Sequence, residues 1–403
     1  MAVTMSRNQA IPMNAGRAQP EWLSGYDPYL LGVCLFTLAL GLVMMTSASI
    51  TIADRQFGEP LHYLWRQGAA AMLGLALAYA TLKIPLHVWE FMSVPLLLLA
   101  LLLLALVLVP GIGREVNGSM RWIRLGPINL QASEPAKLCV IVYLAGYLVR
   151  QAEQVRNSFA GFIIPVLVMT TIAGLLLLEP DFGASVVLFT TALGMLFLGG
   201  VPFGRYLAWM LVAITALASL AVLSPYRMQR LMTFTDPWQD PFNTGFQLTQ
   251  ALIAFGRGEW FGVGLGSSVQ KLFYLPEAHT DFIFSVLAEE LGVFGCLLVL
   301  GLFCFIIWRA FTIGQLAMQA GQAFAAYLAY GIGLIIGIQA FINIGVNMGV
   351  LPTKGLTLPL LSYGSNSLVV TCVLLALLLR IDHETRSSTR ARLPAGVSRY
   401  VAD

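Results

Sequence analysis

Apolar residues occur in long runs along most of the chain, and short polar segments separate one run from the next. A helix needs about 20 consecutive apolar residues to cross the hydrocarbon core of a membrane. Ten runs are candidates for such helices, although several are shorter at their edges, and the pattern places their ends to within a few residues: 30–50, 68–82, 88–109, 138–149, 162–178, 183–198, 206–223, 282–308, 324–348 and 367–379. The pattern predicts an all-α polytopic membrane protein with about ten transmembrane helices.

The longest polar segment, 224–281, separates the seventh predicted helix from the eighth. It is too long for a simple connection, since most loops have fewer than about 15 residues. Within it, 246–255 has the apolar spacing of a helix that lies on the membrane surface or re-enters the membrane. Gly262, Gly264 and Gly266 then mark an irregular turn, and because no strand precedes them their spacing does not indicate a dinucleotide site.

We therefore expect one membrane domain at 29–380 that includes the large extracytoplasmic loop 224–281 between helices 7 and 8. A cytoplasmic tail at 1–28 precedes it, and a basic cytoplasmic tail at 381–403 follows. The first apolar run is longer than the roughly 7 to 15 residues of a signal-peptide core, so it is expected to remain as a helix. Small residues in the ninth run, Gly331, Gly333 and Gly337, would let another helix approach closely.

Composition agrees with a membrane protein. Hydrophobic residues make up 58% of the chain, charged residues only 11%, and the mean hydropathy is +0.79. Such a chain has too little polar surface for a soluble domain of this length. Long helical runs, rather than strands of about ten residues with alternating polarity, exclude an outer-membrane barrel. The five cysteines fall in apolar runs and the four histidines are scattered, so their spacing predicts neither disulfides nor a metal cage held by the protein.

The charge distribution gives an orientation. Five arginines gather at the C-terminal end, which is typical of a cytoplasmic anchor, and an even number of helices then places both termini in the cytoplasm: Arg380, Arg386, Arg390, Arg392 and Arg399. The net charge of +3 includes no basic block of the kind that binds nucleic acid. The opposite face nevertheless carries basic residues, among them Arg114, Arg121, Arg124, Arg227, Arg230, Arg257, Lys271 and Lys354. Basic residues on the face where they are statistically rare indicate an anionic ligand.

Polar and Gly/Pro-containing segments converge on that same face. They are the segments 65–67, 121–137, 179–181, 224–281 and 352–364, whereas the cytoplasmic connections are short and chemically plain. Loops that carry charge and end several helices commonly build a binding site between the helices. The sequence therefore predicts a site that opens to the extracytoplasmic side.

Asp281 is the first candidate within this site, because it stands immediately before the eighth apolar run. An ionised carboxylate costs about 2.5 to 3.5 kcal/mol in hydrocarbon, so it must be solvated or paired. Two interpretations remain open. Asp281 can act as a general base, since nearby apolar walls favour the protonated form of a carboxyl group. Alternatively, it caps the helix that follows.

Other polar residues also have two interpretations each. Glu134 and Lys137 share a helix face, so they are either substrate contacts or a structural ion pair. Asp181 either belongs to the site or only caps a tight turn between two helices. Polar side chains inside apolar runs either serve a function directly or form hydrogen bonds to neighbouring helices. In this chain they are Glu289, Glu290, Gln339, Asn343 and Asn347, and the last three are spaced four residues apart.

Several motifs together resemble the SEDS family, the polytopic peptidoglycan glycosyltransferases of shape, elongation, division and sporulation. They are 264–271 (GLGSSVQK), 275–284 (LPEAHTDFIF), 290–292 (ELG), 343–345 (NIG) and 358–364 (LPLLSYG). The segments 256–260 and 352–359 resemble the cell-division branch more than the elongation branch. One departure is visible, since Ser365-Asn366-Ser367 stands where the family has Gly-Ser-Ser.

The resemblance implies that the protein polymerises lipid II into glycan strands and releases undecaprenyl diphosphate. It implies Asp281 as the general base and Arg66, Arg121 and Lys137 as ligands of the diphosphate. The planar guanidinium of an arginine can donate two hydrogen bonds to phosphate oxygens, and the ammonium of a lysine attracts them as a point charge. Glu134, Lys354 and Ser362 complete the predicted substrate site. Direct displacement inverts the anomeric centre, so no covalent nucleophile is needed. No cofactor is expected, apart from a divalent Mg or Mn ion that the diphosphate could bring.

The resemblance further implies a bacterial inner-membrane location at the division septum. Expected partners are a class B penicillin-binding protein, which crosslinks the new strand, and bitopic regulators of division; no nucleic acid is expected. Two alternatives to polymerisation stay open, a lipid II flippase or transporter and a scaffold of the division complex. A transporter would have internal repeats and charges near the membrane midplane. Neither feature is apparent in the sequence.

Overall fold

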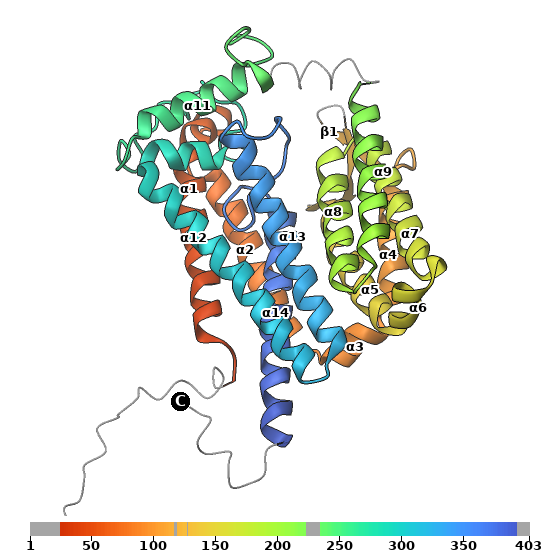
Figure 1. Ribbon diagram of the computed structural model, residues 1–403. Coiled ribbons are helices and arrows are strands. Elements are labelled where there is room, and N and C mark those ends of the chain that lie inside the picture. Colours follow the sequence, from red (N-terminus) through yellow and green to blue (C-terminus); the bar gives the residue numbers. More distant parts are fainter. Residues whose placement is uncertain (1–24, 117–118, 127, 223–233, 393–403) are drawn as a thin grey trace, which may run out of the picture.

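The computed structural model describes residues 25–116, 119–126, 128–222 and 234–392. They form a helical bundle with a small sheet at one end (Figure 1). The helices are α1 (Pro28–Phe57), α2 (His62–Lys83), α3 (Leu86–Phe91), α4 (Ser93–Val107), α5 (Ser133–Arg150), α6 (Ala152–Asn157), α7 (Phe159–Leu178), α8 (Phe182–Leu198), α9 (Phe203–Val222), α11 (Phe246–Gly258), α12 (Ile283–Gln319), α13 (Ala323–Asn347) and α14 (Ser365–Arg392).

Within the described residues, every apolar run predicted from the sequence coincides with helix to within a few residues at its ends. The run 88–109 is divided, because the helix breaks at Met92 between α3 and α4. Among the described residues, five helices are long and apolar enough to cross a membrane, namely α1, α7, α12, α13 and α14, so the protein is a multi-pass membrane protein. The total of ten spans stays a prediction.

The first and last described helices meet at the same end of the bundle. The ring of Tyr26 stacks on the ring of His383, with centroids 4.7 Å apart, just before α1 and near the end of α14. Beside this contact, the buried Asp27 caps α1 and pairs with Arg309 of α12. The helix α11 lies at the opposite end (Figure 1), which we call the α11 end. An even number of crossings predicts this arrangement; which end faces the cytoplasm stays a prediction.

A three-stranded antiparallel sheet adds to the all-α prediction. It consists of β1 (Gly113–Val116), β2 (Ser119–Leu125) and β3 (Ile128–Gln131), in the order β1-β2-β3. The apolar pattern shows only a polar segment here. Asn366, at the departure from the family motif, donates a hydrogen bond of 2.9 Å to the main-chain oxygen of Asn129. This contact connects the start of α14 with β3, so Asn366 has a structural role.

The helix predicted at 246–255 is present as α11, and its end packs directly on α12. A Cβ added at Gly258 would lie 1.9 Å from the main-chain oxygen of Ala288. The helix α12 is interrupted at Gly292, which has a φ of 65°. The carbonyls of Glu289 and Glu290 accept hydrogen bonds from the chain that follows α11, the second from a predicted turn glycine, Gly264. These bonds satisfy backbone groups that the interruption frees.

The helix α13 lies at the centre of the bundle and packs against α5, α8, α12 and α14. Its small residues let other helices of the same chain approach closely. A Cβ at Gly331 would meet Ile141 and Met195, and one at Gly333 would meet Ala310. This tight packing holds α13 in place, so the polar side chains of its second half are held in place with it.

Candidate active site

Asp281 lies just before α12 and does not cap it. The helix begins at Ile283 with Phe282 as its N-cap residue, and no side chain caps it. The main-chain oxygen of Asp281 accepts hydrogen bonds of 2.9 Å from Asn343 and Asn347 of α13. The capping interpretation is therefore wrong, and the role as a base stays a prediction.

Gly355 lies directly against the carboxylate of Asp281. A Cβ added at Gly355 would lie 2.8 Å from Oδ2 of Asp281, closer than real Cβ atoms approach other atoms. The loop 352–364 can therefore lie beside this carboxylate because residue 355 has no side chain. Asp281 itself remains partly accessible.

Three amides of α13 connect the helix with this loop and with its neighbours. Gln339 donates to the main-chain oxygen of Thr357, and Asn343 to that of Leu356. Asn347 accepts from the backbone N–H and the hydroxyl of Ser285 in α12, at 3.0 and 2.8 Å. The prediction that these residues hydrogen-bond neighbouring segments is confirmed.

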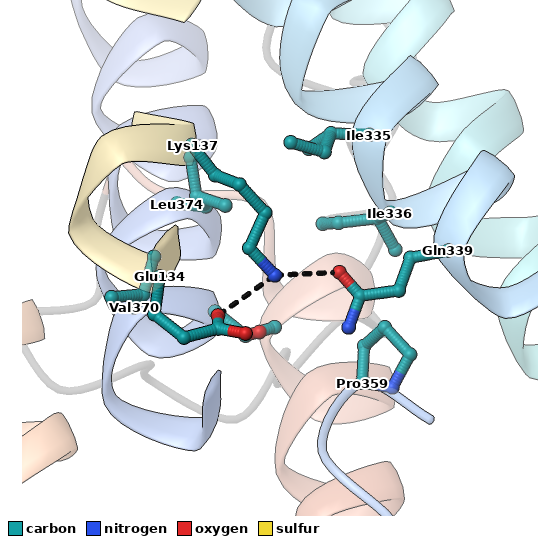
Figure 2. Close-up of a pocket in the computed structure, with 9 residues that line it drawn as sticks. Glu134, Lys137, Ile335, Ile336, Gln339, Pro359, Val370 and Leu374 are labelled. Atoms are coloured by element: carbon teal, nitrogen blue, oxygen red, sulfur yellow. Dashed lines mark hydrogen bonds and ion pairs between the residues drawn. The ribbon is translucent and has the colours of Figure 1, made fainter. Parts of the chain in front are cut away.

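Glu134 and Lys137 of α5 form a buried ion pair of 2.8 Å (Figure 2). The Lys137 ammonium also donates a hydrogen bond of 2.9 Å to Oε1 of Gln339. The cavity beside them has about 10 Å³ of space for water-sized molecules, which is the space of a single water. The ion-pair interpretation is confirmed. A diphosphate reaches Lys137 only if α5 and α13 move apart locally.

Arg121 of β2 holds the turn between α7 and α8. Its guanidinium donates to the main-chain oxygens of Glu179 and Pro180. The carboxylate of Asp181 caps α8, accepting from the N–H of Ala184 at 3.2 Å and from the hydroxyl of Ser133 at 3.1 Å. Asp181 is therefore a capping residue, as one interpretation had it. Arg121 has a structural task here, and its contact with a diphosphate stays a prediction.

Glu179, in the same turn, was not singled out from the sequence. Its side chain is fully buried, and neither carboxyl oxygen has a hydrogen-bond partner among the described residues. Burial and the nearby Asp181 together raise the pKa of Glu179 to about 8, although the charge of Arg121 opposes the shift. A polar residue next to a proline at the end of an apolar run is a weak signal, so the sequence alone could not identify this group.

The remaining predicted ligands lie around the loop 352–364. The ammonium of Lys354 is 4.2 Å from the ring centroid of Phe182, at the start of α8. The hydroxyl of Ser362 accepts from the N–H of Leu358 at 2.8 Å, so it stabilises the turn. Arg66 is exposed on α2. Burial raises the pKa of Tyr363, and the charge of Arg66 partly offsets this shift, which places Arg66 near the turn.

Glu289 and Glu290 are both fully buried near the start of α12. Glu290 forms an ion pair of 2.8 Å with Lys271 and accepts from the hydroxyl of Ser47 in α1. Glu289 accepts from the hydroxyl of Ser268 and from backbone N–H groups of the same loop. Because both carboxylates are occupied by donors, neither is available as a base. They hold the loop that leads to Asp281.

The fold thus brings the predicted groups to the α11 end, but some of them lie on loops and others are buried between helices. Asp281 and Lys354 lie on two neighbouring loops, while Lys137 is buried on α5. The helix α13 connects them, since Gln339 contacts Lys137 and Asn343 contacts Asp281. No three His, Cys, Asp or Glu side chains gather in a metal-binding arrangement within the described ranges.

Known proteins share this sequence and this fold. The profile of a family described as cell cycle protein, covering FtsW, RodA and SpoVE, matches residues 28–387. The chain is 60% identical over 366 residues to the probable peptidoglycan glycosyltransferase FtsW of Nitrosococcus halophilus, covering 91% of this chain and 94% of that protein. It is 54% identical over 371 residues to the corresponding protein of Legionella pneumophila, covering 92% of this chain and 94% of that protein.

Two solved structures give the same result. One is a chain reported in "Structural coordination of polymerization and crosslinking by a peptidoglycan synthase complex", with a TM-score of 0.73, 32% identity and coverage of 89% of this chain and 98% of that chain. The other is the rod shape determining protein RodA of Thermus thermophilus, with a TM-score of 0.67, 31% identity and coverage of 91% and 99%. The SEDS resemblance is thereby confirmed, and this chain belongs to the FtsW, RodA and SpoVE family of cell cycle proteins.

Proposed function

We propose that this protein is a peptidoglycan glycosyltransferase that joins lipid II units into glycan strands, with Asp281 as the general base. Its curated relatives carry that activity in their names. The observation that supports Asp281 most strongly is its position. Two amides of α13 hold its main chain, Gly355 lies against its carboxylate, and its side chain is not used as a helix cap.

The chemistry requires one proton acceptor and a stabilised leaving group. Asp281 removes the proton of the acceptor hydroxyl as its oxygen forms a bond to the anomeric carbon of the donor. The bond from that carbon to the diphosphate breaks, and undecaprenyl diphosphate leaves with the electron pair. Lys137, Lys354 and Arg66 would stabilise the negative charge of the leaving group, and such charge stabilisation is often the largest contribution to catalysis. The anomeric configuration inverts in this single displacement.

Arg121, Glu134 and Ser362 would act mainly by holding this site together. Arg121 fixes the turn before α8, Glu134 pairs with Lys137, and Ser362 stabilises the loop beside Asp281. A Mg²⁺ or Mn²⁺ ion accompanying the diphosphate is also part of the proposal. Asp281 is a carboxylate that could contribute one oxygen ligand, because such ions prefer carboxylate and phosphate oxygens.

A partner that crosslinks the new strand belongs to the same proposal. One similar structure is a synthase complex that coordinates polymerisation with crosslinking. We propose that this chain works in the bacterial inner membrane at the division septum, with both termini in the cytoplasm and a class B penicillin-binding protein as its partner. Bitopic division proteins would regulate the pair.

The deciding experiment uses purified protein, alone and with the penicillin-binding protein, in liposomes that contain lipid II. Glycan chain length and lipid II translocation are measured separately, so that polymerase and flippase activities are distinguished. Asp281→Asn keeps the size of the side chain but cannot accept the proton. General-base catalysis is worth about 10² to 10⁴ in rate, so polymerisation should fall at least that far.

The matched control is Asp236→Asn, an exposed aspartate that caps a turn in the same outer segment. This variant should polymerise at the wild-type rate. Glycan chains of normal length and amount from Asp281→Asn would remove Asp281 from the mechanism. Translocation of lipid II without any polymerisation by the wild-type protein, alone and with its partner, would refute the proposed function itself.

A further inference from the structure

Two of the proposed reactive groups are attached to one helix. On α13, Gln339 accepts a hydrogen bond of 2.9 Å from the Lys137 ammonium, and Asn343 donates one of 2.9 Å to the main-chain oxygen of Asp281. The two amides are four residues apart, and four residues of an α-helix rise by about 6 Å. The cation and the base therefore depend on the same helix, roughly one turn from each other.

The same two amides also hold the loop beside the carboxylate. The Nε2 group of Gln339 donates 2.9 Å to the main-chain oxygen of Thr357, and the Nδ2 group of Asn343 donates to that of Leu356. These two residues directly follow Gly355, which lies against Asp281. Each amide thus connects a proposed reactive residue with the wall of the site.

The chemistry of these contacts requires neutral amides. An ammonium group can only donate a hydrogen bond and a carbonyl oxygen can only accept one, so the orientation of both amide groups is determined by their partners. Gln339 must accept on one side and donate on the other. A carboxylate could not donate to the carbonyls, and a hydrocarbon side chain could do neither. Packing between helices alone would not require this combination.

We propose that Gln339 and Asn343 are positioning residues that set the separation and direction of Lys137 and Asp281 for glycosyl transfer. This inference rests on the proposed function. It assigns the two residues different tasks, since Gln339 aims the cation that receives the diphosphate and Asn343 fixes the main chain of the base. Asn347 also donates a hydrogen bond of 2.9 Å to the main-chain oxygen of Asp281, but it accepts two from Ser285 of α12 as well, so its task is shared with the packing of the helices.

Steady-state polymerisation of lipid II in liposomes tests the two tasks separately. Gln339→Leu removes the acceptor for Lys137, so KM for lipid II should rise about 10-fold with a smaller change in kcat. Asn343→Ala removes one of the two amide donors to the Asp281 main chain, together with the donor to Leu356, so kcat should fall about 10-fold with little change in KM, because misplaced catalytic groups lose rate steeply. The control is Gln322→Leu, an amide at the other end of α13 that bonds Thr385 and Ser388. It should leave both constants unchanged.

Asn343→Asp adds a readout that a packing role would not change. The new carboxylate lies beside the Asp281 main chain and favours the protonated form of Asp281, so the acid limb of the pH–rate profile should move up by about one pH unit. The other titratable groups of the two loops, among them Glu277, His279, Lys354 and Tyr363, are the same in every variant. Asn343→Ala, which adds no charge, should keep the wild-type limb.

Two results would overturn the inference while the wild-type protein polymerises lipid II normally. One is wild-type kinetics in both Gln339→Leu and Asn343→Ala at matched membrane abundance. The other is an equal loss of kcat in these two variants together with a fall in melting temperature, because residues that only stabilise helix packing would behave in this way. Failure of the wild-type protein to polymerise would instead refute the proposed function.

Discussion

Replacement of Gly355 by alanine tests the geometry around Asp281 most directly. The added Cβ would lie 2.8 Å from Oδ2, while ordinary van der Waals contact begins near 3.4 Å, so the carboxylate or the loop must move by about 0.6 Å. The main chain of Asp281 cannot easily retreat, because Asn343 and Asn347 both hold it. The displacement must therefore be taken up mainly by the carboxylate group itself.

The size of the effect follows from that displacement. Catalytic groups must be held within about 0.5 Å of their productive position, and a misplacement of about 1 Å can cost 10²-fold in rate. We expect Gly355→Ala to lower kcat for polymerisation by about 10- to 100-fold, or about 1.4 to 2.7 kcal/mol in activation free energy. Gly355 does not have the positive φ that alanine avoids, so backbone strain should not contribute.

The assay is lipid II consumption at saturating substrate, with melting temperature and membrane abundance measured on the same preparations. Gly256→Ala in α11 is the control, because a Cβ at that position meets no atom within 4 Å. It should keep the wild-type rate. A Gly355→Ala protein that polymerises within about twofold of wild type would show that the carboxylate can shift freely, and the proposed role of its fixed position would be wrong.

Three further predictions concern the buried charges. Lys137→Met should abolish diphosphate binding and lower the melting temperature, because breaking a buried ion pair costs about 3 to 5 kcal/mol. Adding Glu134→Gln to this variant should restore the melting temperature but not polymerisation. If the double variant polymerised lipid II, Lys137 would not belong to the site. Glu290→Gln should destabilise the protein by leaving Lys271 buried and unpaired, and an unchanged melting temperature would contradict this. The pKa of Glu179 is about 8 in the folded protein and near its ordinary value of 4.5 in the unfolded chain. Between these two pH values the folded protein keeps a proton that the unfolded chain has released, so the free energy of unfolding should fall as pH rises. In Glu179→Gln the melting temperature should vary less over that range, and an equal slope in both proteins would refute the assignment.

The sequence by itself determined the architecture. Water cannot solvate the backbone inside a bilayer, so long apolar runs form helices there, and the described residues of the predicted runs coincide with helices to within a few residues. It also singled out Asp281, because a carboxylate at the start of an apolar run requires a specific reason. The motifs around it were specific enough to indicate the family.

Only the tertiary structure decided what each polar residue contacts. The sheet at 113–131 and the interruption at Gly292 leave no trace in an apolar pattern, because they depend on hydrogen bonds between segments distant in the chain. The pairing of Glu290 with Lys271 and the burial of Glu179 likewise follow from how α12 and the turn before α8 are packed. Periodicity places residues on a helix face, but it does not show which residues lie opposite. That is why the contacts of Lys137 and Asp281 with the central helix α13 could be recognised only once the fold had brought them together.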